Sequence, residues 1–194
     1  MIDVRPLTGA DLERALPDVA RLRMAVFRDW PYLYDGSFDY EHRYLQSYRD
    51  SAGAILVGAF DGNRLVGAAT GTPMEDHAED FARAFEGQGV PLKDIFYCAE
   101  SVLLPEYRGQ GIGHAFFDAR EDHARRLGRA YSAFCGVIRP EDHPMRPDGY
   151  RPLDDFWRRR GYEKLPGVIA QFDWTDLGDA AQTPKPLQFW MRRL

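Results

Sequence analysis

The stretch IFYCAESVLLPEYRGQGIGHAFFDAREDHARRLG, residues 95–128, decides how the chain is organised. It begins with an apolar run over 95–104, which predicts a buried strand that Pro105 must end because proline cannot donate to a strand ladder. A glycine-rich loop follows, and apolar residues then recur at helical spacing from Ile112 until Gly128 offers a left-handed cap. The stretch therefore predicts a strand, a phosphate-sized loop and a helix.

The loop has the composition of an anion site. Gly109, Gly111 and Gly113 permit positive φ and close approach of a ligand, and the helix behind them leaves its first amides unpaired. The helix dipole and Arg108 add positive charge that suits a pyrophosphate. A tight turn between strand and helix, with no ligand, is the alternative that glycines alone leave open.

Residues 103–113, LLPEYRGQGIG, make the interpretation more specific. They lack the Gly-Lys-Ser/Thr ending of a P-loop and the G-x-G-x-x-G of a dinucleotide site. They resemble the V-x-P-x-Y-R-G-x-G-I-G motif of the GNAT superfamily of acyl-CoA-dependent N-acyltransferases. The order of elements on either side also resembles that family over nearly all 194 residues.

Composition limits the class of protein. A chain of 194 residues, 44% hydrophobic and 28% charged, is long enough for one core and excludes disordered and fibrous classes. No run of eighteen apolar residues and no apolar leader is present, so we expect a cytoplasmic protein with no membrane partner. Cys98 and Cys135 lie in apolar runs and are expected to be free thiols. A net charge of -5 gives no basic field for nucleic acid.

Hydrophobic periodicity predicts the order β-α-α-β-β-α-β-α-β-α-β-β. The expected strands are 2–7, 54–60, 65–70, 95–104, 131–138, 162–174 and 187–194. The expected helices are one that follows Thr8 and runs to Phe27, then 40–48, one inside 73–94, 112–127 and 153–160, and a proline-rich loop is expected over 139–152. The strand 131–138 suits a parallel neighbour of the strand ending at Leu104. With the resemblance, this predicts an α/β (α+β) fold with a mixed, partly splayed central sheet flanked by helices, as a single domain over 1–194 with a helical insertion around 73–94.

The resemblance implies an N-acetyltransferase that moves an acetyl group from acetyl-CoA to a primary amine of a small molecule or protein, without a metal. In the family, the fourth and fifth strands splay apart, and the strand before the loop pairs with the pantetheine arm. By that resemblance the following residues bind the cofactor: Val102, Leu103, Leu104, Arg108, Gly109, Gln110, Gly111, Ile112, Gly113, His114 and Trp157. An acyl group longer than acetyl and a homodimer both stay open.

Two side chains are candidates for proton transfer. Glu100 is the one carboxylate in an apolar strand, where burial favours uptake of a proton, and the family often has a glutamate acting through water near this position. The alternative is that Glu100 pairs with an arginine of a neighbouring element. The family's acidic tyrosine is replaced by Trp157, whose indole gives up no proton at neutral pH, so Tyr150 or solvent is expected to protonate the thiolate.

Two other functions remain open from the sequence. A non-catalytic acyl-CoA-binding sensor or interaction module fits the missing tyrosine, and a general nucleotide binder fits the glycine loop. Amine-dependent release of free thiol separates the enzyme from the sensor, whereas competition by ATP identifies the nucleotide binder. The acceptor is not fixed by one sequence, because several loops together form its pocket.

Overall fold

The computed structural model describes residues 2–194, except the side chain of Ser47. The helices and strands follow the predicted order. The strands are β1 (Asp3–Leu7), β2 (Ile55–Asp61), β3 (Arg64–Pro73), β4 (Ile95–Leu103), β5 (Tyr131–Val137), β6 (Glu163–Trp174) and β7 (Thr183–Arg193). The α-helices are α1 (Gly9–Phe27), α2 (Phe38–Asp50), α3 (Ala78–Phe81), α4 (Ile112–Arg126) and α5 (Asp154–Arg159). Three short 3-10 helices are η1 (Met74–His77), η2 (Leu92–Asp94) and η3 (Pro105–Tyr107).

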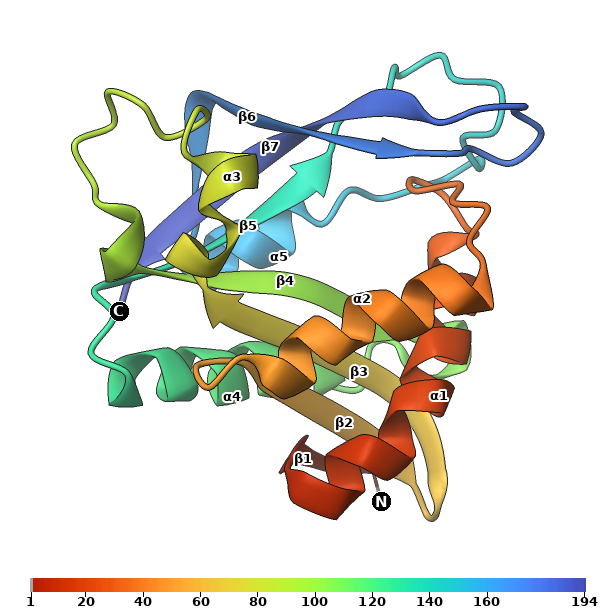
Figure 1. Ribbon diagram of the computed structural model, residues 1–194. Helices are drawn as coiled ribbons and strands as arrows, with labels where there is room; N and C mark the ends of the chain where they lie inside the picture. The colour runs from red at the N-terminus through yellow and green to blue at the C-terminus, as the bar shows by residue number, and fades with distance from the viewer. Residues whose placement is uncertain (1) are drawn as a thin grey trace.

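The strands form one seven-stranded sheet in the order β1-β2-β3-β4-β5-β7-β6 (Figure 1). β4 and β5 are parallel, and every other neighbouring pair is antiparallel. Parallel neighbours need a crossover, and α4 provides it between β4 and β5. The predicted mixed α/β architecture is therefore confirmed.

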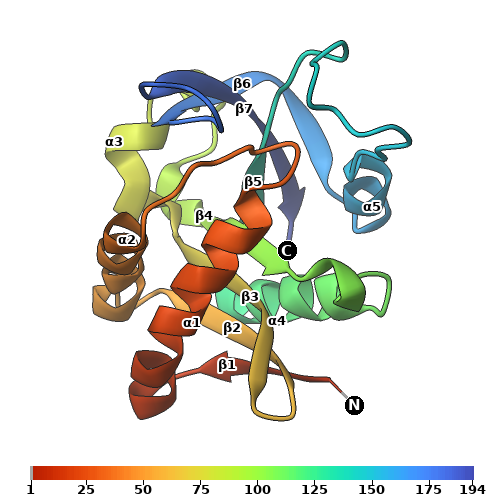
Figure 2. The same cartoon turned by 90° about the vertical axis from the view of Figure 1, so that its right-hand side faces the viewer.

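Helices cover both faces of this sheet. Figure 2 shows α1, α2 and α3 on one face and α4 and α5 on the other. α1 buries the stripe that includes Leu16 and Val19, whereas α4 buries Ile112 and Phe116 against the opposite face. Each face of the sheet thus has its own core, and the residues near the centre of β4 lie between the two.

The middle of the sheet opens between β4 and β5. The two strands pair over only three residues each, from Ile95↔Tyr131 to Tyr97↔Ala133. Beyond that point β4 stays paired with β3, and β5 stays paired with β7 as far as Val137. The facing edges of the two strands therefore diverge toward the loop that follows β4. This confirms the predicted splay.

A bulge in β4 lies at the point of divergence. Thr72 pairs with Tyr97, but Thr70 pairs with Glu100, so β4 has one residue more than β3 in this interval. A bulge leaves backbone groups unpaired and redirects side chains. Here it brings Glu100 to the face that α1 and α2 cover.

The predicted limits of β3 and β7 were wrong, and β3 runs on to Pro73 rather than ending at 70. β7 begins at Thr183 rather than at 187, because Pro184 and Pro186 pair with β6 in a part of the strand that lies beyond the end of β5. Proline is tolerated where a strand has one neighbour. The helix expected inside 73–94 is present as α3, which covers four residues. Phe81 of this helix and Phe85, which follows it, both pack against Phe189 of β7.

No helix among residues 2–194 combines the length and the apolar character needed to cross a membrane.

Candidate active site

The loop between β4 and α4 has the backbone of an open anion cradle. Gly109 has φ +76° and Gly111 has φ +83°, conformations in which glycine is strongly preferred. A Cβ atom at either position would meet no heavy atom within 4 Å. Gly111 is the N-cap of α4, so the first amides of the helix, at residues 112–114, have no intrahelical acceptor. The loop can therefore offer several amides to one anion.

The polar side chains of this loop lie at its rim. Arg108 is exposed, and its Nε donates to the carbonyl of Leu103 at 3.3 Å. Gln110 donates to the Glu106 carbonyl at 3.2 Å, which closes the turn. His114 Nδ1 lies 3.1 Å from Nη1 of Arg160, the residue that follows α5. These contacts fix the loop and leave a guanidinium at its edge.

The three residues predicted to line the pantetheine arm are not equivalent. The amide of Leu104 donates to the Val66 carbonyl on β3 at 3.0 Å, so this residue's amide faces away from β5. Val102 pairs with Ala68 of β3, and its side chain is buried under α1. Because backbone groups alternate along a strand, the polar groups of Leu103 face the opening between β4 and β5.

Trp157 lies on the α5 side of β5. Its ring centroid is 4.9 Å from that of Phe134 and 5.2 Å from that of Trp190. A Cβ added to Gly136 would lie 3.2 Å from the indole, tighter than a usual contact. The indole thus packs closely on the stretch of β5 that borders the opening.

Tyr150 lies in the loop between β5 and α5. Its ring meets Trp30 edge-on at 6.0 Å, and the Arg146 guanidinium lies 5.7 Å from its centroid. Burial raises the pKa of the Tyr150 phenol above its ordinary value, against the opposing charge of Arg146. Tyr150 is therefore protonated at neutral pH and stands where this loop meets the loop between α1 and α2.

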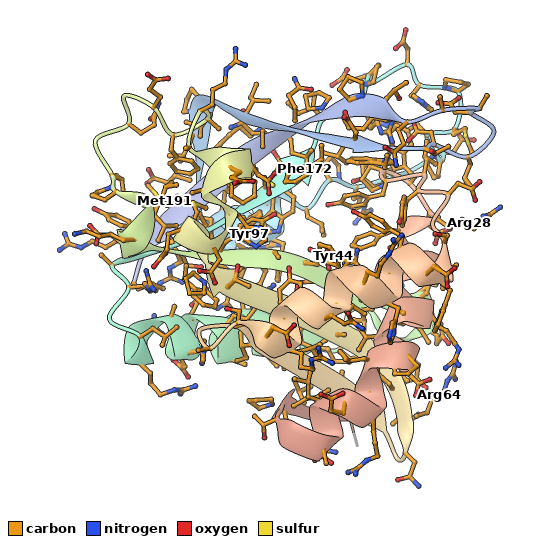
Figure 3. The ribbon with its side chains drawn as sticks, in the orientation of Figure 1. Arg28, Tyr44, Arg64, Tyr97, Phe172 and Met191 are labelled. Carbon is orange, nitrogen blue, oxygen red and sulfur yellow. The ribbon has the colours of Figure 1, made fainter. Side chains whose placement is uncertain are left out.

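Glu100 is half-buried and has partners on two helices. Its Oε2 forms an ion pair with Nη1 of Arg23, on α1. Its Oε1 accepts a hydrogen bond of 3.0 Å from the hydroxyl of Tyr44, on α2. Figure 3 labels Tyr44 between α2 and β4, with Tyr97 on the same face of the sheet. The pairing with an arginine, left open by the sequence, is present, while the role as a base stays a prediction.

The sequence profile of the acetyltransferase (GNAT) family matches residues 19–147. The chain belongs to the GNAT family. A search among curated proteins finds no match.

Solved GNAT structures share this fold at low sequence identity. A ribosomal-protein-alanine N-acetyltransferase from Brucella melitensis is 16% identical, with a TM-score of 0.64 over 99% of each chain. The putative acetyltransferase yncA from Salmonella typhimurium, solved with acetyl-CoA, is 14% identical, with a TM-score of 0.61 over 100% of this chain and 94% of that one. The PaiA N-acetyltransferase of Thermoplasma acidophilum, solved with coenzyme A, is 12% identical, with a TM-score of 0.55 over 100% of this chain and 99% of that one.

As a GNAT protein, the chain is an acyltransferase that uses acetyl-CoA as cosubstrate. The residues present fit that cosubstrate. The opening between β4 and β5 leaves strand edges free for an extended arm, and the glycine loop at its end has open space beside its amides. Among residues 2–194, no group of three His, Cys, Asp or Glu side chains is arranged to hold a metal ion.

The structure shows further residues near the site that were not predicted from the sequence. Arg23 is buried with Glu41, and its Nε donates to the Glu41 carboxylate while Nη1 pairs with Glu100. The available signal was Arg23 itself, a charged residue on the buried stripe of α1 four positions after Val19. A charge at a core position needs a buried partner.

A second buried arginine fixes the bulge from the other face. Arg120 of α4 is 1% exposed, and its Nη1 donates to the carbonyls of Glu100 at 2.8 Å and Thr70 at 3.2 Å. Its Nη2 donates to Ser101 Oγ at 2.9 Å. These bonds satisfy carbonyls that the bulge removes from the ladder, so Arg120 holds the β4 backbone in its divergent course.

A third arginine ties the loops above the opening. Arg139 follows β5 and donates to the carbonyls of Pro31 at 2.8 Å and Tyr32 at 2.6 Å. It also pairs with Asp176 at 2.6 Å. Burial alone would raise the pKa of Asp176, but the hydrogen bond and charge of Arg139 outweigh it and hold that pKa below its usual value. The loop between α1 and α2 is thereby fixed to the segment that follows β5.

Proposed function

We propose that this GNAT protein acetylates a primary amine of a small molecule or protein in the opening between β4 and β5. The observation that carries the proposal is the divergence of these parallel strands after three paired residues, directly before the glycine loop. A flat, fully paired sheet would offer no strand edge in its interior. The amine-bearing acceptor is the finer part of the proposal.

We infer that the backbone does most of the cofactor binding. Leu103 offers its amide to the pantetheine arm, while its carbonyl already accepts from Arg108 Nε, and Val102 and Leu104 hold β4 against β3. The amides of residues 109–114 and the guanidinium of Arg108 face the diphosphate, where helix dipole and charge act together. Trp157 then packs as a wall along the β5 side of the arm.

Acetyl-CoA supplies the acetyl group as a thioester. Glu100, through a water molecule, takes the proton that the attacking nitrogen loses as its bond to the carbonyl carbon forms. Tyr150 or solvent then gives a proton to the sulfur as the carbon–sulfur bond breaks. Because only a neutral nitrogen can attack, an acceptor that enters as an ammonium ion first releases one proton to solvent. The nitrogen loses its second proton to Glu100 and the sulfur gains one, so the products are an amide, a free thiol and one net proton.

The charge around Glu100 supports a cationic acceptor. The groups in contact there are one guanidinium, Arg23, and two carboxylates, Glu41 and Glu100. Their formal sum is one negative charge in a half-buried site. Since an alkyl amine with a pKa of about 10.4 enters as an ammonium ion, this negative charge favours its approach.

The test is acetyl-CoA turnover followed by free-thiol detection across a panel of primary amines and peptide amino termini. Thiol release that depends on the amine, with an acetylated product of matching mass, is the expected result. Tight acetyl-CoA binding without amine-dependent release would refute the proposal and favour a sensor. Longer acyl-CoA esters in the same assay define the acyl group. A cytoplasmic location, a homodimer and a single domain over 1–194 with its insertion around 73–94 stay predictions.

A further inference from the structure

Three ionisable side chains meet on the α1 and α2 face of β4. Arg23 is 5% exposed and Glu41 is 0% exposed, while the Glu100 side chain is 18% exposed and borders the bulge. The Arg23 guanidinium contacts both carboxylates, Glu41 through Nε and Glu100 through Nη1. Glu100 and Glu41 thus share one cation, and of these two carboxylates only Glu100 is partly exposed to solvent.

The remaining titratable groups around this cluster are phenols and one further arginine. The exposed Tyr40 stacks on Tyr44 at the edge of the cluster. The groups nearer to it come from the loop between α1 and α2, from α2, from β4 and from α4, and they are Tyr32, Tyr34, Tyr44, Tyr48, Tyr97 and Arg120. Burial is the first cause that raises the pKa of each of these tyrosines, so they are neutral at physiological pH. Arg120 reaches the Glu100 backbone rather than its carboxylate.

The neighbours of Glu100 hold its carboxylate in one position as well as affecting its charge. Arg23 lies 4.5 Å from the ring centroid of Tyr44 and 5.1 Å from that of Phe27, so its guanidinium is held between aromatic faces. The Tyr44 hydroxyl is bonded to Tyr48 at 2.9 Å and donates to Glu100 at 3.0 Å. Both Glu100 oxygens therefore have partners whose own positions are fixed by packing.

We propose that Arg23 and Glu41 are positioning residues for Glu100: Arg23 orients its carboxylate at the bulge, and Glu41 sets the pH at which Glu100 gains a proton by competing for Arg23. The charge coupling stands on the contacts alone. Its consequence for catalysis rests on the proposed function, in which Glu100 receives a proton.

The sign of the effect follows from the charges. With Glu41 ionised, Arg23 is half neutralised, so its hold on the Glu100 carboxylate is weakened. Replacing Glu41 by neutral glutamine leaves Arg23 paired with Glu100 alone and removes a nearby negative charge. Glu100 should therefore stay ionised to lower pH. Like charges several ångströms apart in a medium of effective dielectric about 20 shift a titration by about one to two pH units.

The direct test is carboxyl ¹³C NMR of full-length protein labelled at glutamate, with the Glu100 signal assigned from Glu100→Gln. In Glu41→Gln we expect the Glu100 midpoint to fall by about one pH unit. In Glu41→Asp, which keeps the charge, we expect it to stay near the wild-type value. An unchanged midpoint in Glu41→Gln would overturn the proposal. If that variant does not fold, Arg23→Lys decides, because one ammonium cannot span both carboxylates and the midpoint should rise; no rise overturns the proposal.

A kinetic test separates this role from the proposed function. In Glu41→Gln, the acidic limb of the pH profile of kcat for amine-dependent thiol release should shift to lower pH together with the NMR midpoint. Calorimetry should show an unchanged affinity for acetyl-CoA. A shifted midpoint with an unshifted limb would overturn the catalytic part. Absence of amine-dependent release in wild-type protein would be the failure of the proposed function, and the NMR titration would still decide the coupling.

Discussion

Replacing Gly111 by aspartate should weaken acetyl-CoA binding strongly without unfolding the protein. The residue is the N-cap of α4, and a Cβ there meets no heavy atom within 4 Å, so a side chain has room. Its φ of +83° costs a non-glycine residue about 1–2 kcal/mol, less for Asn and Asp. The folded state should therefore persist.

The penalty on binding comes from charge. A carboxylate at the mouth of the loop lies beside the diphosphate, and like charges at about 4 Å repel by about 1 kcal/mol in water and about 4 kcal/mol at an effective dielectric of 20. For an exposed loop an intermediate value of about 2 kcal/mol is reasonable, and it corresponds to about thirtyfold in Kd. Salt should reduce this difference because the loop is open to solvent.

Gly111→Asn is the matched control, since asparagine has the shape of aspartate and tolerates the left-handed conformation without the charge. Calorimetry with acetyl-CoA should show a small loss of affinity for Gly111→Asn and about thirtyfold more for Gly111→Asp, with similar unfolding temperatures for both. Equal affinities for the two variants would refute the assignment of the diphosphate to this loop.

Three further predictions concern single side chains. Glu100→Gln should lower turnover at pH 7 while leaving the acetyl-CoA Kd unchanged, and recovery at higher pH would mark a lost base rather than a lost structural contact. Tyr150→Phe should reduce kcat about tenfold if this phenol is the acid, and its raised pKa places any alkaline loss in the wild type above the ordinary phenol range; a change within about twofold assigns the proton to solvent. Cys135, whose pKa burial raises to about 12, should resist alkylation in folded protein, and rapid labelling by iodoacetamide at pH 8 would contradict its buried position.

The parts of the fold that were predictable are those written in local sequence. The turn in residues 103–113 depends on glycines within the same segment, and Gly109 and Gly111 have the positive φ values that such a turn requires. The parallel pairing of β4 and β5 followed from a strand, a helix and a strand in succession. The start of β7 was missed because prolines are read as breakers, whereas a strand with one neighbour accepts them.

The surroundings of Glu100 were not predictable, because they depend on how distant elements cross. Arg23 and Glu41 come from two helices that precede the central strands of the sheet. The helical period of each segment does not predict that Arg23 contacts Glu41 on one side and Glu100 of β4 on the other. The bulge adds to this difficulty. Simple alternation assigns Glu100 to a face by counting from Tyr97, and one extra residue in β4 changes that count.

The replacement of the family tyrosine by Trp157 also has a non-local counterpart. An indole is larger than a phenol, and on β5 it meets Gly136, where a Cβ would come within 3.2 Å of the ring. The glycine therefore provides the space that the tryptophan needs against Phe134 and Trp190. Two positions in different elements thus pack as one unit, and together they present an apolar surface beside β5. In the proposed reaction the acid is then Tyr150, whose loop meets the loop between α1 and α2, or solvent.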